Sequence, residues 1–384
     1  MKKNLFLFSF ALFVYTVTAQ TVVKDSVTGS PVAQASVLNE RGLALGQTNM
    51  EGQLPDLKGA KSISISHIGY AVKKVRVVDL GKELLLSPVI YPVREVVKEM
   101  DKPHCLRLKC YMRKYMLNDC LILKKDTVDA PPIISFTDEI CYLYLFDDES
   151  INLNKSRSLV KRNVLSQTQV KGRKEYLFST SMTSYLEKAK QNIKKGTMEV
   201  RGDTCRQELY RVKKDKKYRQ AVVVRDTVNK TILVDVDHLA PKGSLTVNLG
   251  IVKTQRLVDT NSFVYRLSGY EKVGQSELLA YRSVVHEKDR SLGIQSILPL
   301  PILPSASIDQ WKFVEFYPFE AEFLTHKEYK EDKKEVKDSE MPLEEIDRIK
   351  REINVPALSP EIEQKLSETM QWIEKHKNKE SSKD

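Results

Sequence analysis

The chain has 384 residues, 41% of them hydrophobic, so it is long enough to bury a sizeable core in about two or three domains. Its formal net charge is +11, which favours an anionic partner or a solvated basic surface. Beyond the first 19 residues, no segment holds the roughly 20 apolar residues that a helical membrane span needs. This excludes a membrane-embedded mature chain.

Residues 1–19 have the order of a secretory signal peptide. Lys2 and Lys3 precede the apolar run LFLFSFALFVYTV, and Ala19 ends a small-residue cleavage site before Gln20. The alternative is an uncleaved anchor, but the apolar run is short for a span. No cysteine follows the run directly, so a lipid attachment has no acceptor. We expect a mature chain that begins at Gln20 and resides in the periplasm or outside the cell.

The stretch 62–77 reads SISISHIGYAVKKVRV and alternates with period two. Ile63 and Ile65 share one face and serines share the other, which predicts a strand with one buried and one solvated side. Gly69 marks a bend that we expect only glycine to tolerate. A second half-solvated strand follows, and turn chemistry at 28–31 and 51–52 separates further short strands upstream. The pattern predicts a small β-sandwich.

Three motifs carry a family resemblance. They are Asp25-x-x-Thr28-Gly29-x-Pro31-Val32-x-x-Ala35-Ser36-Val37, then Gly46-x-Thr48 with Gly52, and Ser66-x-Ile68-Gly69-Tyr70. Residues 20–97 therefore resemble the carboxypeptidase-regulatory-like domain, with departures at Asn49 and at Gln53-Leu54. The resemblance implies a transthyretin-like sandwich of the type found on exported Bacteroidetes proteins, including the leading domain of TonB-dependent outer-membrane transporters. It also implies a location in the periplasm or at the outer-membrane periphery.

The same resemblance implies an accessory role without catalysis. In that family the zinc carboxypeptidase activity belongs to a separate domain with an H-x-x-E pair. None of the histidines here begins H-x-x-E or H-E-x-x-H; they are His67, His104, His238, His286, His326 and His376. We expect His67 to be a structural residue at a strand end rather than a metal ligand. We predict no metal, no cofactor and no catalytic residue.

The cysteines follow no C-x-x-C spacing. They are Cys105, Cys110, Cys120, Cys141 and Cys205. In an exported protein this pattern favours one or two local disulfides between 105 and 141, or buried thiols, over a metal or catalytic role.

The middle region, 104–324, is predicted to be a second, β-rich domain of unknown function. Its strand-like runs include ICYLYLF, QAVVVRDTV, TILVDVDHL, FVYRLSGYEKV and LLAYRSVVHEK. The segment 105–116 is interpreted as one or two helical turns, and 182–195 as one helix stopped by Gly196. We expect a curved sheet or half-barrel with that helix against its concave face. Parts of the region are similar to uncharacterised Bacteroidetes envelope proteins, which implies an architecture but no activity.

Two groups of acidic residues in this region are candidates for acid–base work or cation binding. Asp147, Asp148 and Glu149 precede a polar turn, and Asp235 and Asp237 alternate onto one strand face. The alternative for both is a solvated surface. Because no nucleophile elbow, phosphate loop or paired Cys and His motif accompanies them, the sequence favours a region that is not an enzyme.

Residues 155–219 form a basic block with 19 Lys and Arg against 6 Asp and Glu. Such a block attracts polyanions, and in the envelope these are lipopolysaccharide phosphates, acidic glycans or an acidic protein. Nucleic acid lies in another compartment. The alternative is a solvated surface that maintains solubility.

The last segment, 325–384, is predicted to be a charged helical tail. One helix is expected over 343–353, and a second begins at Ser359-Pro360. Its apolar stripe is predicted to pack on this chain or to dock another protein; it consists of Ile362, Leu366, Met370 and Ile373. Because a proline-rich link precedes 309–324, we expect the tail to be separable from the β core.

These observations predict an exported, non-catalytic binding or scaffolding protein of the bacterial cell envelope, beside outer-membrane uptake machinery. A first rival is a hydrolase of glycans or peptides, which requires convergent carboxylates in a deep pocket. A second is a periplasmic lipid or lipoprotein carrier, which requires an open apolar concave face.

Export is directly testable. We expect signal peptidase to remove residues 1–19, because the apolar run and Ala19 meet its requirements. Mass spectrometry of the protein from a Gram-negative host should give a mature chain that begins at Gln20. Recovery of an intact Met1 in the membrane fraction would contradict the prediction.

Overall fold

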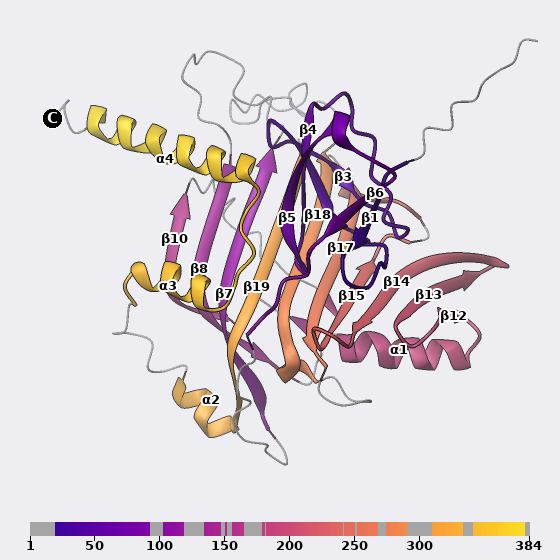
Figure 1. Cartoon of the computed structure of the whole chain (residues 1–384). Coiled ribbons are helices and arrows are strands. Elements are labelled where there is room, and N and C mark those ends of the chain that lie inside the picture. Colours follow the sequence, from indigo (N-terminus) through magenta and orange to yellow (C-terminus); the bar gives the residue numbers. More distant parts are fainter. Residues whose placement is uncertain are drawn as a thin grey trace, which may run out of the picture.

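The computed structural model describes residues 20–92, 103–118, 134–146, 150–151, 156–164, 179–180, 182–240, 242–249, 252–267, 274–289, 309–332 and 341–380. The protein is mainly β with few helices, as predicted. A small N-terminal sandwich packs on one face of a large open sheet (Figure 1). The predicted signal peptide and the acidic group 147–149 lie outside the described residues.

The sandwich has two layers. A parallel pair is formed by β1 (Val22–Asp25) and β6 (Glu83–Leu86). The other layer has the order β3-β2-β4-β5, from β2 (Ser36–Asn39), β3 (Ala44–Gln47), β4 (Ser62–His67) and β5 (Tyr70–Arg76), followed by the short 3-10 helix η1 (Val77–Asp79). Val23, Leu84 and Leu86 of the pair belong to one core with Ile63 and Ile65 of β4.

The large sheet has the order β10-β8-β7-β19-β18-β17-β15-β14-β13-β12, with β16 beside β17. Its strands are β7 (Cys105–Asn118), β8 (Ile134–Leu145), β10 (Ser156–Val164), β12 (Met198–Gly202), β13 (Arg206–Lys213), β14 (Lys216–Asp226), β15 (Thr231–Asp237), β16 (Leu245–Leu249), β17 (Val252–Arg266), β18 (Leu278–Asp289) and β19 (Asp309–Leu324). Two short strands, β9 (Ser150–Ile151) and β11 (Ser179–Thr180), pair separately, and η4 (Gln275–Glu277) precedes β18.

The helical interpretation of 105–116 is wrong, because this segment is β7. Leu108 and Met112 face one side of the sheet, whereas Tyr111 and Tyr115 face the other, and all are buried. Apolar residues alternate here with Arg107, Lys109 and Arg113, which is the period of two of a strand. Tyrosines share a face with these cations and obscure the polar side, so the segment was mistaken for helical turns. Its partner β19 is about 200 residues away in the chain, which no local pattern reveals.

The helix predicted over 182–195 is confirmed as α1 (Met182–Lys194). Gly196 adopts φ +70°, and its amide and that of Thr197 donate to carbonyl oxygens of the last turn, which ends the helix. Ala189 packs with Met198 and Leu209 on the sheet face opposite the sandwich.

The serine face of β4 is not solvated, contrary to expectation. Ser64 is fully buried, and Ser66 accepts a hydrogen bond from Arg282 of the large sheet. On the neighbouring strand, Leu38 packs with Phe313 of β19. The alternation in β4 therefore distinguishes the two faces of the strand, and both faces pack against other parts of the protein.

The expectation for Gly69 is also wrong. Its φ lies outside the left-handed region, and an added Cβ would meet its nearest heavy atom, His67 Nδ1, at 3.6 Å. This is an ordinary van der Waals distance, so the bend does not require glycine.

The tail forms α2 (His326–Asp332), α3 (Glu344–Glu352) and α4 (Pro360–Glu380). The last two helices fit the predicted starts. Helix α2 was not predicted, although Thr325 and Glu328 form a capping box, in which each side chain accepts from the other residue's amide.

The tail is not separate from the core. Ile346, Ile349 and Ile353 of the α3 segment belong to the same buried cluster as the sandwich residues. In α4, Ile362 is buried and Leu366 is partly buried, but Met370 is 53% exposed, and the side chain of Ile373 lies outside the description. The predicted stripe therefore packs only at its first turns, since α4 continues past the sheet (Figure 1).

This packing predicts a stability difference between two neighbouring apolar residues. Ile346→Ala should lower the free energy of unfolding by about 2–4 kcal/mol, because it leaves a cavity at a fully buried position. Leu343→Ala, at a half-exposed position, should change it by less than about 0.5 kcal/mol. Urea unfolding of the mature protein measures both, and equal effects would mean that α3 does not belong to the core.

Candidate functional site

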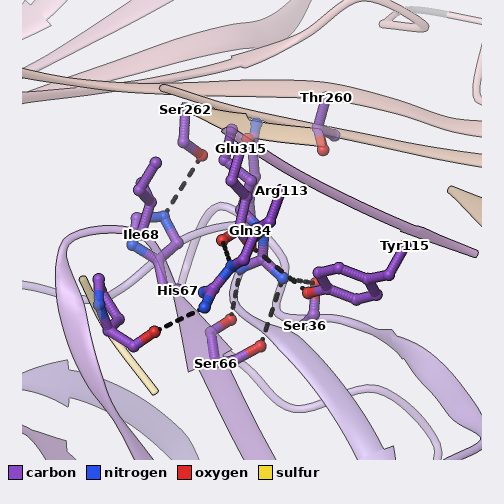
Figure 2. A network of polar contacts seen from close by, with 12 residues as sticks. Gln34, Ser36, Ser66, His67, Ile68, Arg113, Tyr115, Thr260, Ser262 and Glu315 are labelled. Carbon is purple, nitrogen blue, oxygen red and sulfur yellow. Dashed lines mark hydrogen bonds and ion pairs between the residues drawn. The ribbon is translucent and has the colours of Figure 1, made fainter. Parts of the chain in front are cut away.

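A dense cluster of buried polar side chains lies where the sandwich meets the large sheet (Figure 2). At its centre is Glu315 of β19, which is 3% exposed. Arg113 of β7 and Arg282 of β18 lie on either side of it, and both are equally buried. These three strands are adjacent in the sheet, so their side chains meet although they come from distant parts of the chain.

Arg113 joins the sheet to the tail. Its Nε donates to Glu315 Oε2 at 2.6 Å, and its Nη1 donates at 2.8 Å to the carbonyl oxygen of Pro356, which precedes α4. Its Nη2 reaches the hydroxyl of Tyr317 at 3.3 Å, and that hydroxyl donates to Glu315. Burial alone would lower the pKa of Arg113, but Glu315 and the surrounding tyrosines together outweigh burial and hold the pKa well above its ordinary value.

Arg282 joins the sheet to the sandwich. Its Nη1 donates to the carbonyl oxygen of Ser66 at 2.8 Å, and its Nη2 donates to the hydroxyls of Ser36 and Ser66 at 3.2 and 3.3 Å. Its Nε lies 3.3 Å from Glu315 Oε1. Buried Ser36 of β2 and partly buried Ser66 of β4 are therefore acceptors for a sheet guanidinium group.

Beside this cluster, His67, Asp235 and Ser262 bring together the residue types of a hydrolytic triad. Asp235 Oδ1 accepts from Ser262 Oγ at 2.6 Å and lies 3.1 Å from His67 Nε2. Ser262 Oγ also lies 3.4 Å from the same Nε2. His67 Nδ1 accepts from the amide of Gly69, so we assign the ring hydrogen to Nε2.

The geometry of these residues does not activate a nucleophile. A triad needs the carboxylate on one ring nitrogen and the hydroxyl on the other. Here both partners face Nε2, and Nδ1 is occupied by backbone. All of the side chains are at most 4% exposed. His67 was expected at a strand end in a structural role, and it lies at the end of β4, although it is buried and binds the neighbouring domain.

Asp237 does not join Asp235. Its Oδ1 accepts from the amide of Leu239 at 2.8 Å and closes the turn after β15, and burial raises its pKa. The predicted acidic pair is thus divided between an interface and a turn. No group of three or more metal-ligating side chains occurs within the described ranges.

The cavity beside the cluster is too small for a substrate. It measures about 10 Å³ and is lined by residues of the sandwich, the sheet and the segment before α4. That volume holds about one water molecule. The cluster therefore fixes three parts of the chain to one another.

Three further histidines make contacts with a neighbouring side chain. His104 and His326 lie 3.2 Å apart, His286 contacts Asp309, and the His376 side chain is outside the description. Cys105, Cys110 and Cys141 are buried and Cys205 is exposed, whereas Cys120 is outside the described residues. Cys110 lies opposite Cys141 in the β7–β8 register, and burial raises the pKa of the Cys141 thiol.

A second cavity, of about 600 Å³, lies on the sheet face opposite the sandwich. Among its lining residues are Arg211 and Lys213 of β13, and Lys242 and His238 from the segment between β15 and β16. The basic block in the sequence includes only the first two. Among helices of the described part, none has the length and apolar character of a membrane span.

Much of the basic block is used inside the protein. Arg206 donates to the carbonyl oxygens of Pro31 and Met50 at 3.0 and 3.1 Å, and Arg219 pairs with Glu51. These bonds attach β13 and β14 to the sandwich. Arg211, Lys213 and Lys242 are exposed and have no acidic partner among the described residues.

A search of known protein families and of curated proteins finds no match to this chain. The site is therefore interpreted from its own geometry.

The central carboxylate gives a sharp stability prediction. Glu315→Gln should lower the free energy of unfolding by about 3–5 kcal/mol, because it leaves two buried guanidinium groups without a counter-charge. Glu320→Gln, on the same strand but 60% exposed in its pair with Lys109, should cost less than about 1 kcal/mol. Similar losses in both variants would show that the buried cluster does not hold the structure together.

The same residue predicts acid sensitivity. Burial raises the pKa of Glu315, but Arg113 and Arg282 outweigh it, so the pKa lies below its ordinary value. A carboxyl whose folded pKa is depressed stabilises the fold above its unfolded pKa of about 4.3 and loses this contribution as pH falls through the folded value. The stability gap between wild type and Glu315→Gln should therefore be constant from pH 7 to 5 and shrink below about pH 4. Urea midpoints across this range measure it, and a gap that stays constant at pH 3 contradicts the assignment.

Proposed function

We propose that this protein is an exported, non-catalytic binding or scaffolding protein of the bacterial cell envelope, in the periplasm or at the periphery of the outer membrane. Residues 20–97 act in it as a carboxypeptidase-regulatory-like domain. The proposal is supported by the two-layer sandwich and by the motifs that resemble that family. Its partner is an envelope protein or an anionic glycan or lipopolysaccharide, beside outer-membrane uptake machinery.

One observation carries the non-catalytic part of the proposal. The residues with the most suggestive chemistry, Asp235, His67 and Ser262, are buried in the contact between sandwich and sheet. Their hydrogen bonds serve to join two β layers, and a substrate has no access to them. Binding of a partner by this protein would therefore use its outer surface and not these side chains.

The rival functions receive less support. The hydrolase needs convergent carboxylates in a deep pocket, and Asp235 and Asp237 do not converge. The lipid carrier needs an open apolar concave face. The apolar residues on the sheet face opposite the sandwich, such as Leu108, Val234 and Phe263, are buried in a core cluster.

A serine-reactive probe tests the non-catalytic assignment. A fluorophosphonate should not label Ser262, because its Oγ is buried and donates to a carboxylate rather than to a free ring nitrogen. Intact mass spectrometry of the treated mature protein measures labelling, with a known serine hydrolase as positive control. Labelling that disappears in Ser262→Ala would establish a hydrolase and overturn the proposal.

The envelope role needs a separate measurement. A photo-crosslinking residue at Val78, which is 85% exposed on the sandwich, should capture an envelope partner in living cells. The same residue at buried Val37 is the control and should capture none. Recovery of the protein in the cytoplasm, without its partner, would contradict the role.

A further inference from the structure

The larger cavity is formed where three elements converge. The last turn of α1 contributes Asn192, and β12 with the residue before it contributes Met198 and Thr197. Residues 238–240 and 242–245 close the third side. Its volume of about 600 Å³ falls within the range of roughly 300–1,000 Å³ typical of small-molecule sites.

Strand alternation directs the cations into this cavity. Arg206 and Glu208 of β13 point to the sandwich side, where Arg206 bonds to sandwich backbone. Leu209 packs on the opposite side, and Arg211 and Lys213 share its parity. Period two therefore separates the block into cations that hold the sandwich and cations that line the cavity.

The cavity cations lack a counter-charge. The nearby acids have other partners: Asp237 caps the turn at Leu239, and Asp259 pairs with Arg256. Arg211, Lys213 and Lys242 have none among the described residues. Like charges gathered in a concave site raise its positive potential, and a bound anion would relieve their repulsion.

His238 adds an uncharged ring to the cavity lining. Its Nε2 lies 2.6 Å from the Asn261 amide nitrogen, and Tyr281 donates to the amide oxygen of the same Asn261. This arrangement makes Nε2 an acceptor and assigns the ring hydrogen to Nδ1. Burial lowers the pKa of His238, so the ring is uncharged at neutral pH.

Apolar side chains line the rest of the cavity. Met198 and Leu239 are buried there, and Leu245 is 40% exposed, which is high for a leucine. Free inorganic anions would leave this apolar surface in contact with water. A ligand that carries an apolar chain would cover it at about 25 cal/mol per Å².

We propose that this cavity binds an amphiphilic anion, with its phosphate or carboxylate head at Arg211, Lys213 and Lys242 and its apolar chain against Met198, Leu239 and Leu245. The inference rests on the proposed binding function and names the ligand class. The head supplies the missing counter-charge, and the chain covers the exposed leucine.

Calorimetric titration of the mature protein separates the two halves of the ligand. Octyl phosphate below its micelle concentration should bind saturably at one site per chain. Octyl glucoside has the chain without the charge, and inorganic phosphate has the charge without the chain. Each should bind at least about tenfold more weakly, since each loses roughly 1.4 kcal/mol or more of the interaction. Equal binding of octyl phosphate and octyl glucoside, or of octyl phosphate and inorganic phosphate, would overturn the proposal.

Matched charge reversals locate the site. Lys213→Glu with Lys242→Glu should weaken octyl phosphate binding by about tenfold or more. Lys61→Glu with Lys82→Glu makes the same change in net charge at exposed lysines of the sandwich, which do not line the cavity. This control should retain affinity within about twofold, because exposed charges beyond a Debye length are screened. Equal losses in the two pairs would mean that general electrostatics, not the cavity, binds the anion.

The source of the anion is distinguished with vesicles. If the anion is a free amphiphile, octyl phosphate binds in the titration as described above. If the anion belongs to a membrane surface, the protein binds to anionic phospholipid vesicles but not to neutral ones. Binding to vesicles without binding of octyl phosphate would overturn the cavity site. The proposed envelope role would fail in a different way, through recovery of the protein in the cytoplasm or labelling of Ser262. Neither of these results changes what the titration measures.

Discussion

The position of every large part of this protein depends on Glu315, a carboxylate held between two buried guanidinium groups. Two cations and one anion leave a net positive charge inside the protein, and buried charge is costly unless it is hydrogen-bonded. The carbonyl oxygens that satisfy it come from Ser66 in the sandwich and Pro356 in the tail. Removal of either part would therefore expose an unpaired cation in the sheet. This explains why a tail with a charged composition is integrated into the core.

The fold was predictable to the extent that local patterns report it. The strands of the sandwich and the helix α1 followed from alternation, spacing and Gly196. The exposure of strand faces did not follow, because alternation distinguishes two faces without saying what covers each. The serines of β4 look solvated in the sequence, but Ser64 is fully buried and the Ser66 hydroxyl accepts from Arg282. The prediction for β7 failed for another reason, since buried tyrosines share a face with its cations and obscure the alternation.

The central cluster was missed because Arg113 lies about 170 residues before Arg282 and about 200 before Glu315. A local signal for it nevertheless exists. Arg282 stands within LLAYRSVV, and Glu315 within FVEFYPF, so each is the one charge in an apolar stretch of its strand. Because a buried charge must be paired, two such charges of opposite sign predict each other. Asp235 and Asp237 were predicted to act as a pair. Because β15 ends at Asp237, the carboxylate of Asp237 closes the following turn, whereas that of Asp235 lies in the interface.

The same reasoning explains how one basic block serves two purposes. A cation with a defined internal acceptor contributes to structure, as Arg206 does when it binds the sandwich backbone next to Glu51. Cations on the other face of the same strand have no such acceptor and remain available to a ligand. Because β13 is paired on both sides, the bonds that attach it to the sandwich also fix the backbone of Arg211 and Lys213 at the cavity. The sandwich thus determines the geometry of a binding site that it does not touch.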